Sequence, residues 1–163
     1  MKKYIIWFMV TISWIIGQER IAVMQFEGSG VDEITSKNIT DRFSYELSKT
    51  RRFDIVEREM MDKILEEQKF QASGCVADEC AVEIGQLIGV SQIVAGSISK
   101  IGDFYSLNIK LIDVATGKII YQDMDDHEGK VTDFIKGTIK NIAMRMGAEA
   151  SMGSDQSGET TTQ

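Results

Sequence analysis

The spacing of apolar residues predicts a strand and then a helix at the start of the folded part of the chain. The run RIAVMQF, residues 20–26, is apolar and is followed by glycines, as expected for a strand buried on both faces. Ile39, Phe43 and Leu47 then recur every four residues and mark one face of a helix, which Asp32 can cap. The pattern therefore indicates a β-α start.

The next segments continue the alternation. FDIV, residues 53–56, predicts a short strand, and REMMDKILEEQ, residues 58–68, has the period of a helix with an acidic, solvated face. A further helix is expected to begin near Asp78 and to end at Gly89. One buried face of this helix is predicted to carry Cys80, Ile84, Leu87 and Ile88.

From Ser91 onward the pattern changes to strands. Three of them are predicted, at 91–102, 104–114 and 118–129, and the turns between them are so short that the strands must be antiparallel. One last helix is expected to cover the sheet with the apolar stripe Val131, Phe134, Ile135, Thr138, Ile139, Ile142 and Met146. The order β-α-β-α-α-β-β-β-α predicts an α/β fold: a mixed sheet of about five strands, parallel at its N-terminal end, with helices packed on it.

The two ends of the chain have different compositions from the middle. Residues 1–17 hold two lysines and then an apolar run, the proportions of a secretory signal peptide, with an uncleaved anchor or a buried helix as alternatives. Residues 148–163 lack a periodic apolar pattern and predict a disordered polar tail. The expected domain is therefore 18–147.

Composition narrows the classes of partner. The chain is 43% hydrophobic and 26% charged, as in folded soluble proteins, and its formal net charge is -7. Proteins that bind nucleic acids concentrate Lys and Arg on one face, and no such stripe is visible in the sequence. Nucleic acid is therefore not an expected partner.

Two segments raise the question of a metal or nucleotide site. Asp123, Asp125 and His127 would lie on one side of the last strand and form a weak candidate for a divalent cation site. A charged edge strand that resists aggregation explains the same residues more simply. The Gly28-Ser29-Gly30 segment precedes a helix, as phosphate loops do, but completes no known phosphate-binding motif. No catalytic residue, metal or cofactor is expected.

The cysteines, Cys75 and Cys80, are the only two in the chain. Their C-x4-C spacing is not that of thioredoxins or zinc knuckles, and two thiols alone cannot fill a tetrahedral zinc site. We predict a structural disulfide, which requires Cys75 to lie in the loop before Asp78 and is favoured if the chain is exported. Buried free thiols and a redox pair are the alternatives.

Four segments together resemble the CsgG-like family, named for the curli production assembly and secretion protein of bacterial outer membranes. They are RIAVMQF, RFDIVEREMMDKILEEQKF, AVEIGQLIGVSQIVAGS and LIDVATGKI. The resemblance runs from about Arg20 to Met146. It implies an α/β periplasmic domain, with the penicillin-binding-protein activator LpoB and the amino-terminal domain of TolB as relatives.

The resemblance also implies a function. We expect a non-enzymatic, exported protein of the periplasm or the outer-membrane periphery, which binds an envelope protein or a second copy of itself through sheet edges or loop tips. The chain lacks a lipid-attachment cysteine after the apolar run, and its loops are too short for the membrane-inserted hairpins of the curli channel. A subunit of a secretion pore, and a metal- or nucleotide-dependent enzyme, are the alternative functions.

Overall fold

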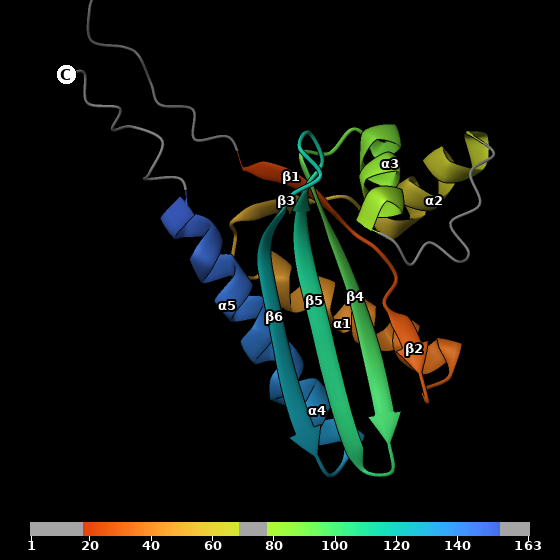
Figure 1. Ribbon diagram of the computed structural model, residues 1–163, viewed down its shortest axis with the longest axis vertical. Coiled ribbons are helices and arrows are strands. Elements are labelled where there is room, and N and C mark those ends of the chain that lie inside the picture. Colours follow the sequence, from red (N-terminus) through yellow and green to blue (C-terminus); the bar gives the residue numbers. More distant parts are fainter. Residues whose placement is uncertain (1–17, 69–77, 154–163) are drawn as a thin grey trace, which may run out of the picture.

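The computed structural model describes residues 18–68 and 78–153, with the backbone alone from residue 150 onward. The chain forms one mixed sheet with helices on both of its faces (Figure 1). Its strands are β1 (Glu19–Val23), β2 (Glu27–Ser29), β3 (Phe53–Ile55), β4 (Gln92–Ile101), β5 (Phe104–Asp113) and β6 (Ile119–Glu128). Its helices are α1 (Glu33–Ser48), α2 (Arg58–Glu67), α3 (Asp78–Ile88), α4 (Val131–Lys136) and α5 (Thr138–Gly153).

The sheet confirms the predicted fold class. Its strand order is β3-β1-β4-β5-β6, and β1 is parallel to both β3 and β4. The long strands β4, β5 and β6 are antiparallel, as their short connections require. The sheet has six strands rather than about five, because a short additional strand, β2, pairs with β4.

The predicted first strand, 20–26, is divided. β1 ends at Val23, and β2 pairs with Ser97–Ser99 farther along β4. Between them Phe26 leaves the sheet: its N–H donates to Oγ1 of Thr40 at 3.0 Å, and its carbonyl accepts from the hydroxyl of Ser36. The Phe26 ring packs over Gly96, where an added Cβ would lie 2.8 Å from it. The missing side chain at Gly96 thus makes room for the break.

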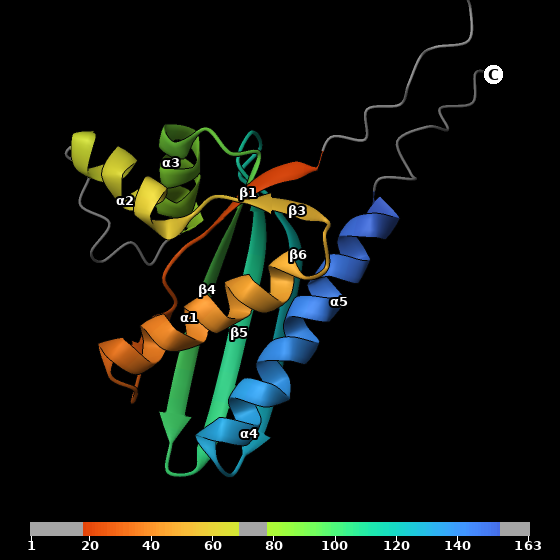
Figure 2. The ribbon, with the colours of Figure 1, turned by 180° about the vertical axis from the view of Figure 1, so that it is seen from behind.

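Helices α1, α4 and α5 cover one face of the long strands (Figure 2). The predicted α1 stripe of Ile39, Phe43 and Leu47 is fully buried against this face. Asp32 caps the helix, because its carboxylate accepts a 2.9 Å hydrogen bond from the N–H of Thr35. The main hydrophobic core therefore lies between the sheet and these three helices.

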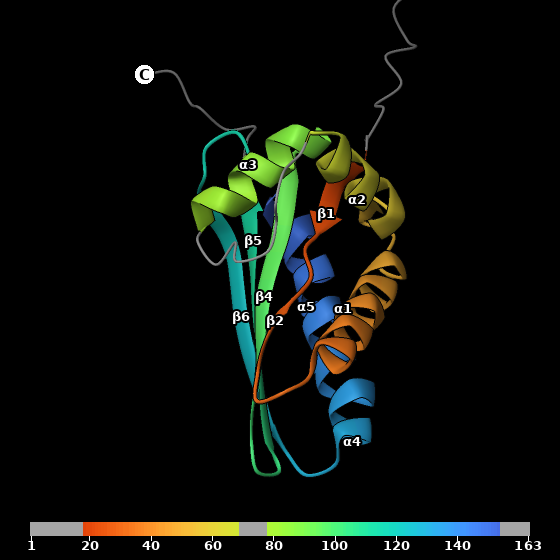
Figure 3. The same cartoon turned by 90° about the vertical axis from the view of Figure 1, so that its right-hand side faces the viewer.

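A second, smaller core lies on the opposite face. There α2 and α3 pack over the upper end of the sheet, around Ile93 and Ile112 (Figure 3). The buried residues of α3 are Ala81, Ile84, Gly85 and Ile88. The buried face of α3 is therefore turned slightly from the predicted one. Ile84 and Ile88 are buried as predicted, but Cys80 and Leu87 are only half-buried at the margin of this core.

The C-terminal helix differs from the prediction in two ways. It is divided at Gly137 into α4 and α5, and α5 continues through Gly153, past the predicted end of the domain at residue 147. Ala148 and Glu149 have high helix propensity, which extends the helix without a buried stripe. Residues 1–17 and 154–163, the predicted signal peptide and the rest of the predicted tail, lie outside the described residues. None of the described helices is long and apolar enough to cross a membrane.

Candidate protein-binding surface

The long strands have a face that the described helices leave uncovered. It lies below α3, on the side of the sheet turned away from α1 and α5 (Figures 1 and 3). We call it the open face. Because side chains alternate along a strand, the register assigns to it Ser97, Ser99, Ile101, Phe104, Ser106, Asn108, Gln122, Met124, Asp126 and Glu128.

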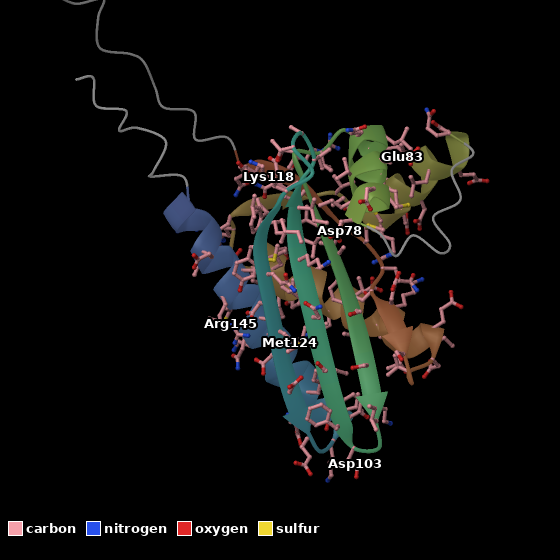
Figure 4. The ribbon with its side chains drawn as sticks, viewed as in Figure 1. Asp78, Glu83, Asp103, Lys118, Met124 and Arg145 are labelled. Carbon is pink, nitrogen blue, oxygen red and sulfur yellow. The ribbon has the colours of Figure 1, made fainter. Side chains whose placement is uncertain are left out.

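Three large apolar side chains on the open face are exposed to solvent. Ile101 is 79% exposed, Met124 62% and Phe104 42%. Met124 lies midway along β6, while Ile101 and Phe104 pair with each other at the β4–β5 turn (Figure 4). The polar side chains of Ser106 and Asp126 lie between Met124 and the Ile101–Phe104 pair, so that the face is amphipathic.

The upper limit of the open face is an ion pair. Lys110 of β5 donates from Nζ to Oδ1 of Asp78 at 3.0 Å, at the first residue of α3. Next to this pair is a small cavity of about 170 Å³, lined in part by Gln25, Glu27 and Asn108. The pair holds the start of α3 against the sheet.

β6 is an edge strand. Along its ten residues it pairs with β5 on one side, and no described strand pairs with the other. An unpaired edge presents backbone N–H and C=O groups to which an extended segment of a partner can add as a further strand. The open face and the β6 edge are therefore continuous with each other.

The other side of β6 faces the helices and carries Asp123, Asp125 and His127, on one side as predicted. Arg145 of α5 donates from Nε to Oδ2 of Asp123 at 2.7 Å and from Nη2 to Oδ2 of Asp125 at 3.1 Å. The His127 ring packs instead near Phe134 of α4, with their centroids 6.1 Å apart. Arg145 thus binds two of the three proposed metal ligands and leaves the third with an aromatic neighbour.

The charges at this cluster are set by its hydrogen bonds. Burial by itself would raise the pKa of Asp123, but hydrogen bonds from Arg145 and Tyr121 outweigh it and lower that pKa. Burial, and next the hydrogen bond to Asp123, raise the pKa of Tyr121 to about 12. Asp123 is therefore ionised at neutral pH and Tyr121 is its neutral donor.

Arg145, Asp123 and Asp125 form an ion-paired cluster between α5 and β6. Across residues 18–68 and 78–153, no three His, Cys, Asp or Glu side chains are placed to hold a metal ion. The carboxylates of Asp123 and Asp125 stabilise the packing of α5 against β6. The structure favours the interpretation of β6 as a charged edge strand.

The Gly28-Ser29-Gly30 segment, which completes no phosphate-binding motif, lies beside β4. Gly28 and Ser29 belong to β2 and pair with Ile98 and Ser99. Gly30 has a φ of 73°, and an added Cβ there would lie 2.3 Å from the carbonyl oxygen of Lys100. These glycines serve strand pairing and close backbone approach. The start of the following helix is already capped by Asp32.

The predicted disulfide is only partly within the described structure. Cys80 is half-buried on α3, in contact with the smaller core. Cys75 lies outside the described residues, so the Cys75–Cys80 bridge stays a prediction.

The sequence pattern did not identify two features of this surface. Arg145 was not singled out, because its pairing depends on how α5 crosses β6. The open face was not assigned to particular residues, although the alternation of Gln122, Met124 and Asp126 with Asp123 and Asp125 carries a signal for it.

Comparison with known protein families identifies the family of this chain. Residues 18–106 match the family described as "Curli production assembly/transport component CsgG". The chain belongs to the CsgG family. The matched part of this CsgG-family chain runs from β1 into β5, so that β6, α4 and α5 lie beyond it. A search of curated proteins found no match.

Solved structures share the fold of this CsgG-family chain. The C-terminal domain of LpoB from Salmonella enterica is 14% identical with a TM-score of 0.59, over 71% of this chain and 87% of that one. The lipoprotein GNA1162 from Neisseria meningitidis is 12% identical with a TM-score of 0.59, over 85% and 99%. The LpoB C-terminal domain from Escherichia coli is 15% identical with a TM-score of 0.56, over 74% and 90%. At these identities the likeness is one of fold.

Proposed function

We propose that this CsgG-family chain is a non-enzymatic protein exported to the cell envelope, where it binds another protein through its open face and β6 edge. Its place of action would be the periplasm or the periphery of the outer membrane. Membership of a family described by an assembly and transport component supports a role based on protein contacts. The proposal concerns the type of activity and leaves the partner to be identified by experiment.

The observation that carries the proposal is the exposure of Met124 and Phe104 on a sheet face that the described helices leave uncovered, beside the edge of β6 with which no described strand pairs. Full burial of a Met or Phe side chain is worth roughly 1.5–3 kcal/mol. Both side chains are about half exposed, so a partner that covers them gains part of this free energy. Backbone pairing along β6 would add orientation and specificity.

Charge on the edge disfavours a second copy as the occupant. Asp123 and Asp125 are compensated by Arg145, but Asp126 and Glu128 form no ion pair among the described residues. Pairing of β6 with β6 of another copy would bring like charges together across the new ladder, which is destabilising. A different protein therefore fits this edge better than self-assembly into an oligomer or a pore.

Site-specific photocrosslinking in cells tests the proposal. A photoreactive residue replaces Met124 or Phe104 in the full chain, and Glu83, exposed on α3, is the matched control position (Figure 4). We expect the first two positions to give adducts with one and the same protein and Glu83 to give none. Met124→Asp should abolish the adduct formed from position 104.

Three outcomes would overturn the proposal. One is equal crosslinking from Glu83, which would mean nonspecific contact. Another is no adduct from Met124 and Phe104 in cells where the chain is exported. The third is an adduct whose only component is a second copy of the chain, which would assign the surface to self-assembly.

A further inference from the structure

A groove lies between the C-terminal end of α1 and the middle of α5, on the helix side of the sheet. Its volume is about 470 Å³, and Lys49, Arg52 and Lys140 line it together with Met144 and Gly147. Figure 2 shows the two helices lying close together near this end of α1. The groove is therefore separated by the sheet from the open face, and an inference about it does not depend on the proposed function.

The close packing of α1 and α5 shapes the groove. At Gly147 an added Cβ would lie 2.6 Å from Cγ2 of Thr50, so a glycine is needed for the turn after α1 to contact α5. Met144, one helical turn earlier on α5, is 53% exposed and gives the groove an apolar wall. The shape is thus fixed by contacts between backbone and short side chains.

The groove contains one buried acid, and that acid is already neutralised. Glu46 is 2% exposed, and its Oε2 accepts a 2.9 Å hydrogen bond from Nζ of Lys49. Arg42 Nη2 lies 2.6 Å from Oε1 as an ion pair whose geometry is not that of a hydrogen bond. The hydrogen bond from Lys49 outweighs burial and lowers the pKa of Glu46. Glu46 therefore fixes the Lys49 and Arg42 side chains in place.

Arg52 and Lys140 add positive charge to that of Lys49, although Lys140 also helps to lower the pKa of Glu46 through its charge. In the part of the chain that the structure describes, neither forms an ion pair. The Lys49 ammonium is hydrogen-bonded to Glu46, and its Nζ also lies 5.1 Å from the centre of the Tyr45 ring. The groove is thus positively charged in a chain whose net charge is -7. The cations of the groove attract an anion locally, although the net negative charge of the whole protein repels it.

We propose that this groove binds a phosphate group carried on a molecule with an apolar part. A phosphate monoester has a charge of about -1.5 to -2 at neutral pH, which matches two cations without an ion-pair partner among the described residues better than a single carboxylate does. The Arg52 guanidinium can bind two phosphate oxygens side by side, and the Lys140 ammonium can add a point charge. The apolar part of the ligand would contact Met144.

This chemistry has two possible sources, a lipid head group and a soluble phosphate ester. In one arm, butyl phosphate, a soluble phosphate monoester with an apolar chain, is titrated into the full chain and the amide signals of Met144 and Gly147 are followed by NMR. In the other arm, the full chain is sedimented with vesicles of phosphatidylcholine alone or mixed with phosphatidic acid. Binding in the first arm assigns a soluble ester, and binding only to vesicles with phosphatidic acid assigns a lipid.

The matched variants are Arg52→Gln/Lys140→Gln and the control Lys118→Gln/Lys136→Gln, which removes the same charge elsewhere. The first pair removes two charged hydrogen-bond donors, so we expect at least about tenfold weaker binding there and no change in the control. Both variants should melt at the temperature of the wild-type chain. Equal weakening in the control would mean general electrostatic attraction and would overturn the proposal.

Two further results would contradict it. One is the absence of phosphate binding in both arms. The other is equally tight binding of succinate, since a site selected by the charge of phosphate should prefer it over a carboxylate.

Discussion

Arg145 of α5 donates a 2.7 Å hydrogen bond from Nε to Oδ2 of Asp123 on β6. This contact joins the last helix to the edge strand. Asp123 is mostly buried, whereas Arg145 is about half exposed, so that solvent screens part of the interaction. The pair is therefore a modest contribution to stability with a definite dependence on pH.

Arg145→Gln should lower the free energy of unfolding by about 1 kcal/mol at pH 7. The folded-state pKa of Asp123 lies below its ordinary value, so its contribution is present above that value and is lost as pH falls through the folded-state pKa. The difference between wild type and variant should therefore shrink in acid. Urea denaturation between neutral pH and about pH 3 measures it, with Lys136→Gln as the control. A difference independent of pH would contradict the assignment.

Tyr121 should ionise only at a pH well above that of an ordinary tyrosine. Burial and the neighbouring carboxylate of Asp123 raise its pKa from about 10 to about 12, so its stabilising effect is complete below pH 10 and is lost as pH rises through 12. Phenolate absorbance, taken as wild type minus Tyr121→Phe, reports this single group. In Asp123→Asn the midpoint should move down toward the ordinary value. A wild-type midpoint near 10 would show that Tyr121 is not held in this environment.

Gly85 should not tolerate alanine. An added Cβ would lie 2.5 Å from Cγ2 of Val114, so Gly85→Ala should destabilise the chain by about 1–3 kcal/mol through overpacking between α3 and the sheet. Alanine otherwise favours a helix over glycine by about 1 kcal/mol. In a Val114→Ala background the same substitution should thus become neutral or stabilising. Thermal unfolding of the wild type, the two single variants and the double variant forms a double-mutant cycle. Additive effects would show that the two residues do not interact.

In protein prepared from an oxidising compartment, the two cysteines should carry no free thiol. Thiol titration of the unfolded, unreduced full chain is expected to find no reactive cysteine, because Cys75 and Cys80 form the predicted disulfide. After reduction the count should be two. Cys75→Ser provides the control, since it should expose one thiol at Cys80. Two thiols without reductant would contradict the bridge.

Elements with a local signal could be predicted from the sequence. Ile39, Phe43 and Leu47 mark the buried side of α1, because the helical period alone determines which side chains share a face. For the same reason the period of two in β6 correctly placed Asp123, Asp125 and His127 together. The antiparallel arrangement of β4 to β6 follows from turns too short for any other connection.

Features that depend on distant residues could not be predicted in this way. The end of β1 depends on Gly96, which leaves space for the Phe26 ring, and nothing near Phe26 indicates it. The role of Asp123 depends on Arg145, which lies on an element whose crossing angle the sequence pattern does not reveal. The open face required knowing where α2 and α3 stop covering the sheet. In each case the missing information is the packing of one element against another.

The break at Phe26 also has a consequence for folding. The backbone groups that the sheet cannot pair at this residue are bound by the hydroxyls of Thr40 and Ser36 on α1. Buried backbone groups without a partner are costly, so the break between β1 and β2 is stable only while α1 is docked. We therefore expect the helix and the divided strand to open together, so that exchange of the Phe26 amide would report on the docking of α1.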